Sequence, residues 1–83
     1  MTSADTTIEL DSRTTDGIEV RLLWHPARER VTVTAHDWRS GEIVEVEVRE
    51  DERALDVFHH PYAYAAFHGE VPRPASESLT PTR

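Results

Sequence analysis

The chain has 83 residues, contains no cysteine and carries a formal net charge of −7. A chain of this length forms one domain with a thin core, and the lack of thiols excludes disulfides and zinc sites built on cysteine. The chain has 16 acidic and 9 basic residues. This acidic balance disfavours general nucleic-acid binding, which needs cationic side chains to neutralise phosphates.

Two further features bear on where the protein works. No apolar run approaches the roughly 18 residues that a membrane-spanning helix needs, so we expect no membrane partner. The residues from Met1 to Asp5 lack the basic and apolar regions of a secretory signal, and we therefore expect a cytoplasmic protein. The chain also lacks Lys, Asn and Gln, whose codons are rich in adenine, which indicates a bacterial genome of high GC content.

Residues 1–6 are polar and are expected to be disordered. Alternation of apolar and polar residues predicts a first strand at about 7–11, followed by a turn at Asp16-Gly17. The segments 17–25, 30–38 and 42–49 alternate more clearly, and each is predicted to be a strand with one apolar and one polar face.

The two loops between these last three strands set their register. If His25 faces Arg30 in the first loop and Asp37 faces Glu42 in the second, the alternating apolar positions of the three strands fall on one face of the sheet. That face comprises Val20, Leu22, Trp24, Val31, Val33, Ala35, Val44, Val46 and Val48. The pattern therefore predicts an antiparallel β-meander.

After the last strand the apolar residues recur at spacings of three and four, which is typical of a helix. Acidic residues at 50–52 favour a helix N-terminus, and Pro61 interrupts the stripe because it lacks an N–H and clashes with the preceding turn. We expect a helix over 51–59 and a second one, kinked or fully broken from the first, over 61–67 and ending at Gly69.

Residues 70–83 are rich in Pro, Ser and Thr and are expected to be a disordered tail. The fold is thus predicted to be α+β. A single domain over 7–69 would hold a three- to four-stranded antiparallel meander, packed on its apolar face by the C-terminal helix.

The polar face of the predicted sheet also carries Leu23, Trp38 and Ile43. They are either isolated exposed hydrophobic residues, which are common, or a patch for a protein partner or a second copy of the chain. A thin core favours association, because small domains often gain stability from a partner.

Acidic residues are densest where the last strand meets the helix. The cluster consists of Glu42, Glu45, Glu47, Glu50, Asp51 and Glu52. It is either a solvated strand edge and helix start, or a docking surface for a basic protein whose binding would weaken with salt.

The predicted helices contain His59, His60 and His68, together with Asp56. Imidazole and carboxylate groups are ligands for zinc and other transition metals, so metal binding is an alternative function. The chain has no His-Glu-x-x-His motif, and Pro61 disturbs the helical spacing between Asp56 and His60. The histidines equally suit positions at helix ends.

No motif predicts catalysis or a cofactor. None of the serines lies in a nucleophile elbow, no glycine-rich loop could hold phosphate, and the neighbours His36 and Asp37 point to opposite faces of a strand. Our leading hypothesis is a small non-catalytic interaction or accessory domain, one form of which is a homodimer through the outer sheet face. A metal-binding protein and an acidic regulator of a basic partner are the alternatives.

Overall fold

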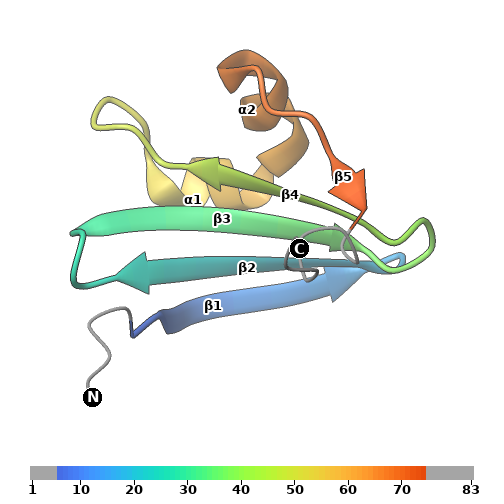
Figure 1. Cartoon of the computed structure of the whole chain (residues 1–83), viewed down its shortest axis with the longest axis horizontal. Coiled ribbons are helices and arrows are strands. Elements are labelled where there is room, and N and C mark those ends of the chain that lie inside the picture. Colours follow the sequence, from blue (N-terminus) through green and yellow to red (C-terminus); the bar gives the residue numbers. More distant parts are fainter. Residues whose placement is uncertain (1–5, 75–83) are drawn as a thin grey trace, which may run out of the picture.

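The computed structural model describes residues 6–74, which form a five-stranded antiparallel sheet with two short helices on one of its faces (Figure 1). The elements are β1 (Ile8–Thr15), β2 (Ile18–His25), β3 (Arg30–Asp37), β4 (Glu42–Glu47), α1 (Ala54–His59), α2 (Pro61–His68) and β5 (Arg73–Pro74). The strands lie in the sheet in chain order. The predicted α+β fold, a β-meander with a C-terminal helical layer, is confirmed.

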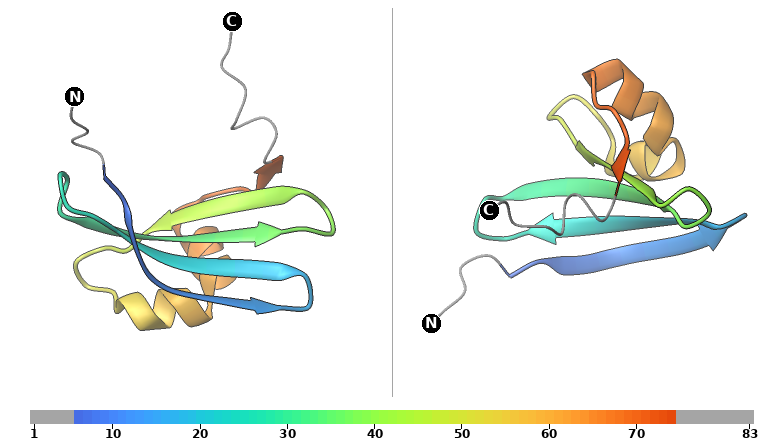
Figure 2. Two further views of the ribbon diagram at one scale, coloured as in Figure 1. Left: turned by 90° about the horizontal axis from the view of Figure 1, so that it is seen from below. Right: turned by 45° about the vertical axis from the view of Figure 1, so that its right-hand side comes forward.

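Both predicted registers are also confirmed, since His25 pairs with Arg30 and Asp37 pairs with Glu42. We call the face covered by α1 and α2 the inner face and the opposite one the outer face (Figure 2). The buried core lies between the inner face and the helices and consists of Val20, Leu22, Val33, Ala35, Val44, Val46, Val57, Phe58 and Ala65.

The first strand is longer than predicted, because β1 continues to Thr15 instead of ending near residue 11. Its register with β2 shifts between Glu9 and Asp11, so a bulge interrupts the alternation on which the prediction depended. The turn that follows has only two residues, Asp16 and Gly17, with φ of 54° and 80°. Two left-handed residues in a two-residue hairpin match the right-handed twist of the strands.

The helical layer breaks at Pro61, as predicted, and α2 ends at Gly69, whose φ is 78°. The start of α1 differs from the prediction. Residues 49–52 form a turn in which the Glu52 N–H donates to the Arg49 carbonyl at 2.9 Å. The Glu52 carboxylate accepts the Arg49 N–H, also at 2.9 Å. These bonds hold the acidic residues in a turn, so the helix begins at Ala54.

Arg13 joins β1 to the end of α1. Its Nη2 donates to the carbonyl oxygens of Phe58 and His59 at 3.0 and 3.3 Å, and its Cζ lies 5.4 Å from the centre of the Phe58 ring. The last carbonyl groups of a helix have no intrahelical donor and carry partial negative charge. Arg13 therefore caps α1 from a strand that lies 45 residues earlier in the chain.

The expected tail over 70–83 overlaps the described residues at 70–74. There the structure differs from the expectation, because Arg73 and Pro74 pair with Ile43 and Glu42 at the edge of β4. An edge position tolerates a proline, which has no N–H to donate. Residues 1–5 and 75–83 lie outside the described part of the chain. Within residues 6–74, neither helix has the length and apolar character of a membrane-spanning segment.

Candidate interaction site on the outer sheet face

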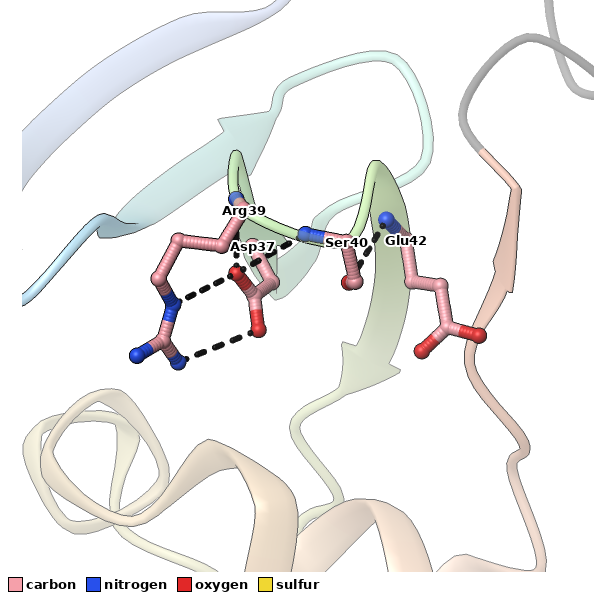
Figure 3. Close-up of polar contacts among 4 residues, drawn as sticks. All are labelled: Asp37, Arg39, Ser40 and Glu42. Atoms are coloured by element: carbon pink, nitrogen blue, oxygen red, sulfur yellow. Dashed lines mark hydrogen bonds and ion pairs between the residues drawn. The ribbon is translucent and has the colours of Figure 1, made fainter.

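The turn between β3 and β4 is organised by the Asp37 carboxylate (Figure 3). Asp37 Oδ1 accepts the backbone N–H of Arg39 at 2.9 Å and its side-chain Nε–H at 3.2 Å, and it accepts the Ser40 N–H at 3.4 Å. The hydrogen bond from the Arg39 side chain lowers the pKa of Asp37 and keeps the carboxylate ionised. The Gly41 N–H closes the turn on the Asp37 carbonyl at 2.7 Å.

This turn is also fixed to the turn between β1 and β2. The Trp38 N–H donates to the Gly17 carbonyl at 2.8 Å, and the Arg39 side chain packs so closely on Gly17 that a Cβ there would lie 3.0 Å from Arg39 Cγ. The two turns form one unit, and Trp38 projects from it.

The Trp38 side chain is 61% exposed yet held on two sides. Its ring stacks on His36, with 3.8 Å between centroids and 16° between planes. Its Nε1–H donates to Glu19 Oε1 at 3.2 Å, and Arg21 Nε donates to the other oxygen of Glu19 at 3.0 Å. The hydrogen bond from Arg21, and then the one from Trp38, lower the pKa of Glu19.

A cavity of about 240 Å³ opens beside this tryptophan. We call its lining the Trp38 site, which consists of Glu19, Arg21, Thr34, His36, Trp38 and Ile43. An adjoining cavity of about 430 Å³ shares Thr34 and Ile43, continues along β4 past Glu45 and Glu47, and is also lined by Arg73, which pairs with Ile43 at the sheet edge. The outer face is therefore hollowed from the Trp38 site to the β4 edge.

The structure brings two of the three predicted apolar residues together. Trp38 and Ile43 line the same cavity, and Ile43 pairs with His36. Leu23 pairs with Thr32, four residues before His36 on β3, which separates it from Ile43 by about 13 Å along the strand. The predicted patch is thus reduced to Trp38 and Ile43.

The predicted acidic surface is divided by the fold. Glu45 and Glu47 line the larger outer cavity, and Glu47 forms an ion pair with Arg30 at 2.7 Å. Glu52 instead points inward, where its Oε2 lies 2.7 Å from His68 Nε2 and both side chains are almost withdrawn from solvent. Burial opposes ionisation of Glu52, but the hydrogen bonds from His68 and from the backbone lower its pKa overall.

The four predicted metal ligands do not converge. Asp56 accepts a hydrogen bond from the Tyr64 hydroxyl at 2.5 Å, and His68 is bonded to Glu52. The two remaining histidines are exposed at the junction of α1 and α2. Across residues 6–74, the structure contains no group of three or more His, Asp or Glu side chains placed to hold a metal ion.

Sequence reasoning missed His36 and Glu19 as members of the site. The signal for His36 was present, because residues two apart on a strand share a face and His36 precedes Trp38 by two. Glu19 could be found only from the register, which places it opposite His36.

Comparisons with protein-family models, with curated proteins and with solved structures give no match for this chain.

Proposed function

We propose that this chain is a small non-catalytic protein-interaction domain of the cytoplasm, which binds another protein chain through the Trp38 site. The observation that carries the proposal is an exposed tryptophan whose orientation is fixed by a stacked ring and a hydrogen bond. Tryptophan is enriched among the residues that contribute most to binding free energy, because a large apolar ring is combined with one polar donor.

The fixed orientation also favours tight contact. Immobilising a free side chain on binding costs about 0.5–1.5 kcal/mol, and the contacts with His36 and Glu19 have already restricted this ring in the unbound domain. The adjoining cavities give a partner concave surface on both sides of Ile43.

The same geometry supports a function without catalysis. A general base works best with a pKa near neutrality, whereas the pKa of Glu19 is lowered by its bonds to Arg21 and Trp38. The ring of His36 is covered on one side by the indole, and no nucleophile lines the Trp38 site beyond the hydroxyl of Thr34.

A second copy of the chain is the first partner to test, because small domains with thin cores often gain stability by association. Light scattering after size-exclusion chromatography measures the mass of the wild type, of Trp38→Ala and of a control, Phe67→Ala, which removes an exposed aromatic ring from α2. If the chain forms a homodimer through the outer face, the wild type and the Phe67→Ala control should be dimers and Trp38→Ala should be a monomer.

If the wild type is monomeric, the partner is a different protein. Proteins retained from a lysate by the immobilised wild type are then identified, purified and titrated against wild type and Trp38→Ala. We expect at least a tenfold loss of affinity in the variant. A partner that binds both equally well contradicts the proposal, and one whose binding disappears at high salt is held by the carboxylates of Glu45 and Glu47 instead.

A further inference from the structure

The side of helix α2 that faces solvent carries no charged residue. Its exposed residues are Tyr62, Ala63, Ala66 and Phe67, and Phe67 is 75% exposed. Its inward side is apolar as well, with Pro61 and Ala65 buried. A surface helix normally carries charged residues opposite its apolar stripe, and a helix that is apolar on all sides is normally covered. We call the solvent side of α2 the α2 face. It is an exposed apolar surface of the kind that another part of a protein normally covers.

A cavity of about 310 Å³ lies beside the α2 face. One wall is made by Ala63 and Phe67, which are four residues apart and so share a helix face, and by Tyr64. Asp51 and Glu52, from the turn after β4, line the cavity as well. The α2 face thus offers an apolar ridge next to a hollow.

Carboxylates gather at the Tyr64 side of this hollow. The Tyr64 hydroxyl donates to Asp56, and this bond, burial and the negative charges of Asp56, Glu52 and Asp51 raise the pKa of Tyr64. The sequence has no Lys or Arg between Arg53 and Arg73, so both helices lack a cationic side chain other than histidine. The α2 face is consequently apolar and is bordered on the Tyr64 side by carboxylates, which form its acidic margin.

We propose that the α2 face docks an amphipathic helix of another protein, with apolar residues over Phe67 and Ala63 and an Arg or Lys entering the hollow toward Asp51. Long basic side chains fit such a place, because their aliphatic stems pack on apolar groups while their charged ends meet carboxylates. A helix-in-groove contact of this kind is a common mode of peptide recognition.

The charges disfavour a second copy of this chain as the occupant. Two α2 faces packed together would bring two acidic margins close in a molecule that already has a net charge of −7. A helix of eight residues offers far less than the roughly 800 Å² per partner of a stable interface, so any contact here needs charge attraction, which two acidic faces cannot supply. A basic helix, drawn in by charge, suits a small contact of this type.

A defined probe tests the inference. A synthetic helical peptide of Leu and Ala with Arg along one edge of its apolar stripe is titrated into the full isotope-labelled chain by NMR, beside the same peptide with Glu in place of Arg. We expect saturable shifts at the amides of Asp51, Ala63 and Phe67. The Glu peptide should bind at least roughly tenfold more weakly, and about 0.5 M salt should weaken the Arg peptide.

Matched variants locate the contact. Phe67→Ser should reduce the affinity for the Arg peptide at least about tenfold, and Ala63→Arg should do so by placing a like charge on the wall of the hollow. Leu55→Ser is the control, since Leu55 is 57% exposed on α1 and lies outside the cavity lining. It should change the affinity less than about twofold.

Four results would overturn the inference: no saturable binding, equal binding of the Glu peptide, shifts centred on the Trp38 site, or α2 shifts that depend on protein concentration alone. The inference does not rest on the proposed function. A failure here leaves the comparison of Trp38→Ala with wild type unaffected, and the reverse also holds.

Discussion

Replacing Arg13 tests whether the contact between β1 and α1 stabilises the domain. A hydrogen bond from a charged donor contributes about 1.5–3 kcal/mol when buried, and the two bonds to Phe58 and His59 are partly exposed or exposed. The ring contact with Phe58 adds about 0.5–1 kcal/mol. In the opposite direction, Arg13 Nε is buried and finds no acceptor among residues 6–74, which costs about 1 kcal/mol or more.

The balance of these contributions predicts that Arg13→Ala lowers the free energy of unfolding by about 1–2 kcal/mol. Arg13→Met should lower it by less, because it keeps the stem over the Phe58 ring and removes the unsatisfied Nε. Urea unfolding followed by circular dichroism measures both. With a slope of about 1 kcal/mol per molar urea for a domain of this size, the alanine variant should unfold at about 1–2 M less urea.

Arg28→Ala is the matched control for the loss of one positive charge, since Arg28 is exposed in the turn between β2 and β3. It should change stability by no more than about 0.5 kcal/mol. If Arg13→Ala is as stable as Arg28→Ala, the capping role assigned to the guanidinium is refuted. If Arg13→Met is less stable than Arg13→Ala, the contribution of the stem packed on the Phe58 ring is refuted instead.

Three further outcomes are expected. Gly17→Ala should lose about 1–2 kcal/mol in thermal unfolding, because φ is 80° and the added Cβ meets Arg39 at 3.0 Å; an unchanged melting temperature would contradict the coupling of the two turns. Val57→Ala should lose about 2–3 kcal/mol in urea unfolding, since this side chain is fully buried, and a loss below about 1 kcal/mol would mean that α1 packs loosely. The pKa of Glu52 is lowered in the folded state from its usual 4.5, so its stabilising bond to His68 is fully present above that pH and is lost as the pH falls through the lowered value. Unfolding measured between pH 7 and pH 3 should therefore show a smaller acid-dependent loss in Glu52→Gln than in wild type, and identical profiles would exclude this role of the carboxylate.

The register of the sheet could be predicted because the loops at His25–Arg30 and Asp37–Glu42 each place the alternating apolar residues of the neighbouring strands on the same face. A shift of one residue at His25–Arg30 or at Asp37–Glu42 would have moved every apolar side chain of a strand to the other face. The break at Pro61 was predictable for a local reason, because proline removes a helical donor wherever it occurs.

The errors arose where a distant or irregular contact decides the structure. The bulge in β1 interrupts the alternation, and the four further strand residues 12–15 were therefore missed by the sequence pattern. The bonds between Arg49 and Glu52 hold residues 49–52 in a turn, although an acidic run is also typical of a helix start. The Trp38 site joins residues from three strands and a turn, so only its apolar members were visible as candidates.

The hydrogen bond from the Trp38 N–H to the Gly17 carbonyl ties the position of the tryptophan to the folded state of the domain. If the Trp38 site binds a partner as proposed, that partner would bind the native chain but not the unfolded one, because the stack on His36 and the bond to Glu19 orient the indole only in the assembled sheet. Folding and recognition are then thermodynamically linked. A partner at a hundred times its dissociation constant would stabilise the native state by about 2.7 kcal/mol, a large share of the total for so small a domain. The cellular lifetime of this chain would then follow the concentration of its partner.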